Sequence, residues 1–207
     1  GHGDTSTDSH LDLPALNHSE SRLATVELPP FEQAIATGVD SVMTAHLLIA
    51  AWDAKLPVTL SQKIVTEILR NRLGFSGLVV TDALIMGGIT KYATPEIVAV
   101  MAVEAGTDIL LMPDNPEVAI ASIYDAVQTG RIKQSRIQES LARIWQAKQQ
   151  VFADSTTITE LSSDRARSTV NSILKNSLQQ SKTSIITDPH APGRNLIVVD
   201  DLLTANY

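Results

Sequence analysis

Asp82 is the residue whose position most strongly suggests chemistry. It directly follows the short apolar run Leu78–Thr81, which a Gly74–Gly77 turn precedes and a Met86-Gly87-Gly88 segment soon follows. Such a run between turn signals predicts a fully buried strand. A carboxylate at the carboxyl end of that strand lies where parallel α/β proteins have their catalytic and ligand-binding residues. An Asp at this point is also a common N-cap of the next helix, so position alone leaves both interpretations open.

A second group of reactive side chains opens the chain, in the segment G-H-G-D-T-S-T-D-S-H. Its His and Asp side chains suit Zn or Fe, but their spacing matches no metal fingerprint. In an acid/base interpretation, Asp8 orients and charges the imidazole of His10, as a carboxylate does in a catalytic triad. A solvated polar loop without chemistry is the third interpretation. No G-x-S-x-G motif occurs, so acyl transfer is not supported.

Alternating strands and helices would have to position these side chains. Residues 1–30 are polar, end at Pro29-Pro30, and are expected to form a long loop. Apolar segments predict strands at 41–45, 78–81 and 108–112, and helical spacing or capping residues predict helices at 31–37, 60–73, 95–105, 117–127, 135–152 and 162–179. Strands that are apolar on both faces and alternate with helices indicate βαβ units and a parallel sheet.

The composition is that of an acidic globular chain. It has 207 residues, 43% of them hydrophobic, which is enough to bury a core. The net charge of −7 argues against sequence-independent nucleic-acid binding, which needs a basic surface. The chain lacks Cys, which excludes disulfides and thiol chemistry, and no apolar run is long enough to predict a membrane span. It opens at Gly1 rather than Met, so cytoplasmic, cell-envelope and secreted locations in a bacterium all stay open.

Taken together, several segments resemble glycoside hydrolase family 3, and its β-N-acetylglucosaminidase branch most closely. They are the opening G-H-G-D-T-x-x-D-S-H, V-M-T-A-H at 42–46 and G-F-S-G-L-V-V-T-D-A-L at 74–84. The segment A-G-T-D-I-L-L-M-P at 105–113 is similar to the last barrel strand of that family. The resemblance runs continuously to about Phe152 and implies an α/β fold, the TIM (β/α)8 barrel.

The resemblance also implies a retaining mechanism. Asp82 falls on the family's nucleophile, His10 on its acid/base, and Asp8 on the partner of that histidine in an Asp-His dyad. This departs from the usual pair of carboxylates. An imidazole, with an ordinary pKa of about 6.5, can both donate and accept a proton near neutral pH. As a neutral base it would also repel an incoming phosphate less than a carboxylate, which leaves phosphorolysis open. No cofactor or metal is expected.

Further residues are substrate-binding candidates. His2 and Asp4 match the family loop that shapes the pocket, and Met86 corresponds to a residue that lines the sugar site, although a Met after a strand is often ordinary packing. His46 ends its strand at the catalytic face, but a buried, hydrogen-bonded histidine is an equal alternative. Arg70, on the helix before the strand of Asp82, is expected to be a structural or solvated charge.

The chain is expected to hold only part of the implied barrel. Residues 1–152 would supply its C-terminal part, about strands six to eight, because three strands cannot close a barrel. Residues 153–194 would be a linker with a connecting helix, and 195–207 the start of a truncated second α/β domain. The family's Lys-His-Phe-Pro segment, whose Lys and His hold sugar hydroxyls, is not in the sequence. We therefore expect a fragment at both ends, which needs the missing N-terminal half of the barrel for activity.

The activity implied by the resemblance is removal of non-reducing terminal β-linked N-acetylglucosamine from peptidoglycan fragments or chito-oligosaccharides. The nearest alternative is a β-glucosidase of the same family, against which the Asp8-Ser9-His10 segment argues. A non-catalytic carbohydrate-binding remnant and a metal-dependent hydrolase are alternatives from other classes. A carbohydrate is the expected partner in the first three cases.

Overall fold

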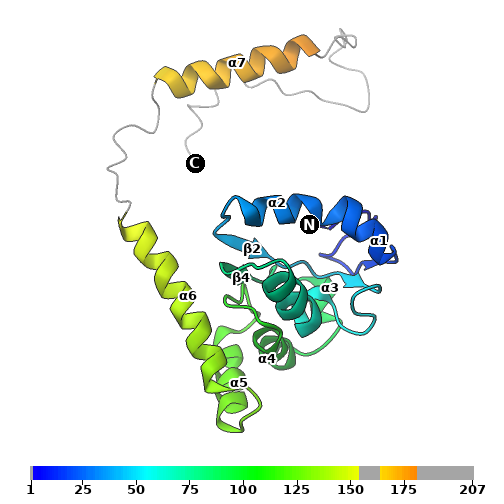
Figure 1. Cartoon of the computed structure of the whole chain (residues 1–207), viewed down its shortest axis with the longest axis vertical. Helices are drawn as coiled ribbons and strands as arrows, with labels where there is room; N and C mark the ends of the chain where they lie inside the picture. The colour runs from blue at the N-terminus through cyan, green and yellow to red at the C-terminus, as the bar shows by residue number, and fades with distance from the viewer. Residues whose placement is uncertain (1, 154–163, 181–207) are drawn as a thin grey trace, which may run out of the picture. The chain divides into compact units, whose positions relative to one another are not determined.

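The computed structural model describes residues 2–153 and 164–180. The chain divides into two units, 1–155 and 156–207 (Figure 1). In the second unit the described part is helix α7 (Asp164–Gln180), which coincides in sequence with the helix expected over residues 162–179. The strand expected at the start of the second α/β domain lies outside the described residues.

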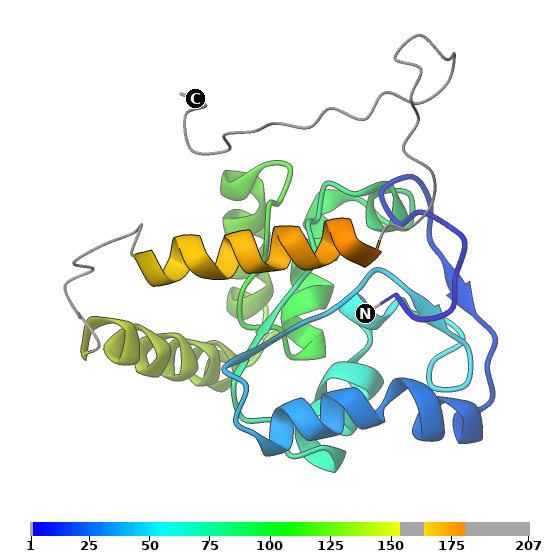
Figure 2. The same ribbon diagram turned by 90° about the horizontal axis from the view of Figure 1, so that it is seen from above.

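A small parallel sheet forms the centre of the first unit. Strand β2 (Ser41–Met43) pairs with β4 (Leu78–Val80) in parallel, with Ser41 opposite Leu78. Ile109 adds a parallel bridge to Val80, so the third predicted strand is present as extended backbone with one bridge. The predicted parallel arrangement of these three segments is confirmed. A separate parallel pair joins β1 (Ala15–Leu16) to β3 (Leu48–Ile49), and Figure 2 shows these dark-blue and cyan segments side by side.

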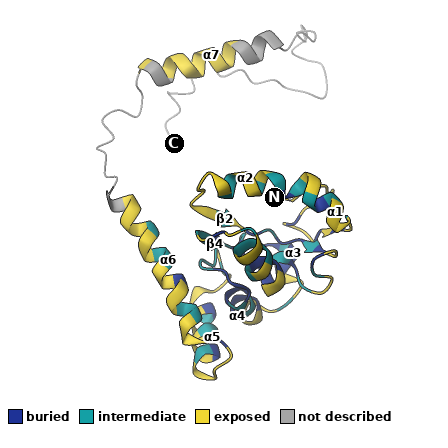
Figure 3. Cartoon of the chain, in the orientation of Figure 1, coloured by how far each residue is buried: buried dark blue, intermediate teal, exposed yellow. Residues whose placement is uncertain are grey.

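Helices bury the apolar side of the sheet. The core of this region includes Val79 of β4, Val65 of η3 (Lys63–Arg72) and Ala105 of α4 (Pro95–Ala105). Helix α4 has Pro95 in its first turn and ends at Gly106, whose φ of 118° favours glycine. Figure 3 shows α4 largely buried, which agrees with a nearly uniform apolar composition rather than one apolar stripe.

The other predicted helices are also present, with their ends displaced by a few residues. They are α2 (Pro29–Ala36), α5 (Pro116–Gln128) and α6 (Gln134–Ala153). The helix expected over 60–73 is divided into the 3-10 turn η2 (Val58–Leu60) and the π-helix η3. The hydroxyl of Ser61, which directly precedes this helical segment, accepts a hydrogen bond from the Ile64 N–H (3.3 Å).

The expectation of a loop over residues 1–30 is wrong for its second half. Helix α1 (Glu20–Arg22) is capped by Ser19 and continues into the π-helix η1 (Leu23–Glu27). Leu23 and Leu28 are both buried and belong to the core cluster that also contains Trp52. These two leucines are five residues apart, a spacing that suits the i→i+5 turn between them rather than a 3.6-residue period. The apolar periodicity of an α-helix is therefore missing from the sequence.

Within residues 2–153 and 164–180, no helix has the length and apolar character needed to cross a membrane.

Candidate active site at the carboxyl ends of the strands

Asp82 lies where β4 ends, held by backbone on both sides. Its N–H donates to the Thr44 carbonyl (3.1 Å), which extends the β2–β4 ladder by one step, and its Oδ1 accepts from the Ala83 N–H (2.8 Å). The side chain is half-buried and has no ion pair among the described residues. The next helix, α3 (Gly87–Thr90), begins after Met86 at its N-cap, so Asp82 caps no helix. The capping interpretation of Asp82 is therefore wrong.

Asp8 and His10 form the hydrogen-bonded pair that the sequence predicted. The distance from His10 Nδ1 to Asp8 Oδ1 is 2.8 Å, and the same oxygen accepts the His10 N–H at 2.9 Å. The hydrogen bond from the His10 N–H and, to a smaller extent, the one from its imidazole lower the pKa of the Asp8 carboxyl below its ordinary value. Because a carboxylate only accepts, Nδ1 carries the proton and Nε2 is left for another partner. Both side chains are exposed, His10 by 74%.

The residue between them points the opposite way. Ser9 is 2% exposed, and its Oγ lies 2.6 Å from Nε2 of His2. The Leu11 and Asp12 N–H groups both donate to the Asp8 carbonyl (3.0 Å each), which closes a tight turn. The turn therefore buries Ser9 and directs Asp8 and His10 outward.

The turn is attached to the segment that follows Asp82. The Gly87 N–H donates to the His10 carbonyl and the Gly88 N–H to the Ser9 carbonyl, both at 2.9 Å. Two segments that are far apart in the sequence, one with the dyad and one with the strand-end carboxylate, thus share backbone hydrogen bonds. The sequence offers one signal of this contact, the Gly87-Gly88 pair, which by itself predicts only a turn.

His46 is fully buried beside this segment. Its Nε2 is 3.0 Å from the Ala83 carbonyl and its Nδ1 is 2.8 Å from Oγ1 of Thr59. Since a carbonyl only accepts, Nε2 carries the proton and Nδ1 accepts from the Thr59 hydroxyl. Burial lowers the pKa of His46, opposed by the Ala83 carbonyl and the charge of Asp82. This arrangement agrees with the buried-histidine alternative, and sugar contact by His46 stays a prediction.

The remaining candidates lie around the same loop. Asp4 is exposed and its Oδ2 lies 3.5 Å from Nε2 of His18 and 3.9 Å from Nη2 of Arg22. His2 is exposed and holds Ser9, as described above. Met86 is 6% exposed, as ordinary packing requires. Substrate binding by His2, Asp4 and Met86 stays a prediction. Across the two described ranges, no group of three or more His, Asp or Glu side chains is placed to hold a metal ion.

A carboxylate at the carboxyl end of a parallel strand lies where α/β proteins, barrels included, place functional residues. The family described as "Glycosyl hydrolase family 3 N terminal domain" matches residues 1–147. This chain belongs to glycosyl hydrolase family 3, whose N-terminal domain is a TIM-barrel type fold.

Individual relatives agree with the family match. A β-N-acetylglucosaminidase of this family from Paenibacillus sp. str. FPU-7 is 44% identical, with a TM-score of 0.73 over 79% of this chain and 32% of that one. The β-N-acetylglucosaminidase from Thermotoga maritima is 29% identical, with a TM-score of 0.64 over 70% of this chain and 32% of that one. Beta-hexosaminidase A from Pseudoalteromonas piscicida is 36% identical over 169 residues, 72% of this chain and 28% of the relative. The chain therefore spans about a third of the length of these relatives.

Proposed function

We propose that this chain carries the catalytic residues of a retaining β-N-acetylglucosaminidase. Asp82 is the nucleophile, His10 the acid/base and Asp8 its orienting partner. The observation that supports this proposal best is the pair of backbone hydrogen bonds from Gly87 and Gly88 to the loop of the dyad. These bonds attach the loop of His10 to the segment that follows Asp82, which supports a shared site for a carboxylate nucleophile and an imidazole acid/base in a double displacement.

In the first step, an oxygen of Asp82 attacks the anomeric carbon and the bond from that carbon to the glycosidic oxygen breaks. The departing oxygen takes the proton from Nε2 of the His10 imidazolium, so the aglycone leaves as a neutral alcohol. Asp8 stabilises the imidazolium through Nδ1–H and fixes the plane of the ring, as a carboxylate does in other triads. The partial exposure of both dyad side chains leaves room for the aglycone.

In the second step, the now neutral His10 takes a proton from a water molecule. The hydroxide equivalent attacks the anomeric carbon, the ester bond to Asp82 breaks, and the sugar leaves with its configuration retained. One residue thus acts first as acid and then as base, which microscopic reversibility demands of a retaining enzyme.

N-Acetylglucosamine as the substrate is suggested by the relatives. The family members from Paenibacillus sp. and Thermotoga maritima are both named β-N-acetylglucosaminidases. Peptidoglycan fragments and chito-oligosaccharides both carry non-reducing terminal β-linked residues of this sugar. Both are therefore included as substrate classes.

The proposed enzyme includes further barrel strands that precede this chain. We assign β2, β4 and the segment around Ile109 to about strands six to eight of the barrel. Among the described residues, β2 pairs with β4 only, so its other edge has no strand partner. Met43 on that strand is 52% exposed, which is unusual for a large apolar side chain in a barrel strand. A preceding strand would pair with this edge and cover Met43.

Covalent trapping tests the proposal directly. A 5-fluoro-N-acetylglucosaminyl fluoride is incubated with this chain and with a length-completed chain, in which the N-terminal barrel segment of the Paenibacillus relative precedes Gly1. Peptide mass spectrometry should find the sugar on Asp82 in the length-completed chain. Asp114→Asn is the matched control for Asp82→Asn, because Asp114 is exposed and follows the neighbouring segment of the sheet. An adduct elsewhere, or on the Asp82→Asn variant, would contradict the assignment of the nucleophile.

The same experiment separates the alternatives. An adduct on Asp82 in this chain alone would show that the additional barrel strands are unnecessary. Absence of any adduct, together with sugar binding that Asp82→Asn leaves unchanged, would support a non-catalytic carbohydrate-binding protein. Faster turnover of 4-nitrophenyl β-glucoside than of the N-acetylglucosaminide would support the β-glucosidase alternative.

A further inference from the structure

The loop of the dyad is attached to the segment after Asp82 by two backbone hydrogen bonds. Its side chains Asp8 and His10 point outward, and its backbone is held by the N–H groups of Gly87 and Gly88. Gly87 binds the carbonyl of His10 itself, so the position of the imidazole depends directly on this bond. The second anchor, at Ser9, lies one residue away.

We propose that Gly87 and Gly88 are positioning residues that set the place of His10 relative to Asp82. This inference rests on the proposed catalytic roles of those two residues. A retaining enzyme needs its two catalytic groups at a narrow separation, about 5 Å in enzymes with two carboxylates. The Gly87–Gly88 pair transmits the position of the strand end to the loop, because both lie on the segment that leaves Asp82.

Close approach of the two backbones explains why both positions are glycine. A Cβ at Gly87 would lie 2.7 Å from the His10 carbonyl oxygen and 2.6 Å from that of Leu11. A Cβ at Gly88 would lie 2.9 Å from the carbonyl oxygens of Ser9 and Asp12. These neighbours are backbone atoms, which cannot rotate away as a side chain would. An alanine at either position therefore has to push the loop outward.

The segment that carries the two glycines is itself well fixed. The carbonyl of Ala83 accepts hydrogen bonds from Nε2 of His46 and from the Met86 N–H (3.1 Å). The Leu84 N–H donates to the Leu111 carbonyl at 2.9 Å, which joins the segment to the neighbouring part of the sheet. The attachment therefore connects an exposed loop to a rigid turn, and a displaced loop would move while the turn and Asp82 stay in place.

This asymmetry predicts a distinctive kinetic phenotype. In the length-completed chain, Gly88→Ala should lower kcat about 10- to 100-fold for a substrate with a poor leaving group, because a displacement of about 1 Å costs up to about 100-fold. The KM should change little. For activated aryl substrates, the rate of the first step, formation of the glycosyl-enzyme, should fall less, because their leaving groups need less protonation. Azide should accelerate their turnover and yield a glycosyl azide, because this nucleophile needs no base. These are the effects of His10→Ala in a weaker form.

A double variant separates positioning from a general structural effect. If Gly88 acts through His10, then Gly88→Ala should cost less than about twofold in the His10→Ala background, since coupled residues are not additive. Thr90→Ala, an exposed change on the same short helix, is the matched control and should resemble the unmodified enzyme. Full additivity in the double variant, or unchanged kinetics of Gly88→Ala, would overturn the proposal.

Two further measurements keep the outcomes distinct. If Gly88→Ala does not fold, hydrogen exchange of the unmodified protein decides, because the Gly87 and Gly88 amides must be protected to the same extent as the Leu84 amide. Rapid exchange at both glycines would refute the attachment. If His10→Ala itself shows no sensitivity to azide or leaving group, the proposed function has failed. If His10→Ala behaves as expected and Gly88→Ala does not, only the positioning proposal has failed.

Discussion

Replacement of Asp108 by Asn should strongly destabilise the fold without any direct effect on the proposed chemistry. The Asp108 carboxylate is fully buried and binds three guanidinium groups: Arg70 at 2.5 Å, Arg143 at 3.1 Å and Arg136 at 3.4 Å. It also accepts hydrogen bonds from the Ser140 hydroxyl at 2.6 Å and from the Val79 N–H at 3.0 Å, and the second bond joins it to the middle residue of β4. Asp108→Asn removes the charge, which leaves the largely buried Arg70 and Arg143 without an acidic partner among the described residues and leaves Arg136 with Glu139 alone, at 3.8 Å.

The expected loss of unfolding free energy is about 3–5 kcal/mol, the typical cost of removing one partner from a buried ion pair. The side chains of Arg70, Arg136 and Arg143 are 10%, 17% and 25% exposed, respectively, so water screens little of their interaction with Asp108. Urea unfolding of the length-completed chain measures the change. The control is Glu104→Gln, which breaks a more exposed pair with Arg131 and should cost only about 0.2–1 kcal/mol. Equal effects of the two changes would refute our reasoning about burial.

The same carboxylate gives a pH test. Burial alone would raise the pKa of Asp108, but hydrogen bonds from Ser140 and Val79 and the charges of Arg70 and Arg143 hold it below its ordinary value. The native state therefore binds fewer protons there than the unfolded state. The contribution of Asp108 to stability is complete above the unfolded pKa of about 3.9 and is lost as pH falls through the lower folded value. Asp108→Asn should reduce the slope of stability against pH in this acid range, and an unchanged slope would contradict the account.

Other predictions concern the site itself. Asp8→Asn should lower kcat about 100- to 10,000-fold, because the His10 imidazole loses the carboxylate that fixes its tautomer. The control is Asp12→Asn, an exposed change in the same loop that should leave kcat unchanged. Equal effects of the two changes in steady-state assays would contradict the dyad. Burial lowers the pKa of His46, so its share of stability is complete above the unfolded pKa of about 6.5 and declines as pH falls below it. His46→Gln should weaken that decline in thermal unfolding scans made between pH 7 and pH 5, values chosen to span the titration of about 6.5. Activity should be insensitive to EDTA, and a loss that added Zn²⁺ restores would favour the metal-dependent alternative.

The parallel arrangement of β2, β4 and the Ile109 segment was predictable from sequence, because buried parallel strands are apolar on both faces. Helix α4 was predictable for a similar reason, since Pro95 and Gly106 mark its ends. The helical turns over residues 20–27 were not, because they have two buried leucines and no α-helical period. Continuous apolar runs and end signals thus reveal the sheet strands and α4, but not the short helical turns over residues 20–27.

For the candidate site, local contacts were predictable and distant ones were not. Asp8 and His10 are two residues apart, so their hydrogen bond follows from a tight turn. The burial of Ser9 between them has no sequence signal, because it depends on the distant Gly88 and on His2. The same limitation applies to Arg70, for which a structural or a solvated role was open. Its structural role depends on Asp108, and only the fold brings the two together.

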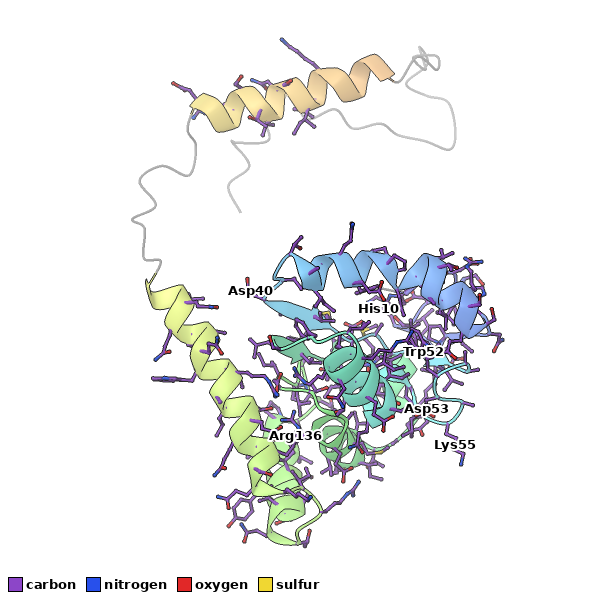
Figure 4. The ribbon with its side chains drawn as sticks, viewed as in Figure 1. His10, Asp40, Trp52, Asp53, Lys55 and Arg136 are labelled. Carbon is purple, nitrogen blue, oxygen red and sulfur yellow. The ribbon has the colours of Figure 1, made fainter. Side chains whose placement is uncertain are left out.

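Two carboxylates lie near β4, and they have different roles for a physical reason. Within the strand, the Val79 N–H donates to Asp108, whose charge is compensated by arginines from η3 and α6. At its end, the Asp82 carboxylate has no cation beside it among the described residues. A carboxylate as well paired as Asp108 would be a poor nucleophile, because its lone pairs are already engaged. Figure 4 shows that His10 and Arg136 lie in different parts of the unit, so substitutions in the arginine cluster should alter stability without altering the pH profile of catalysis.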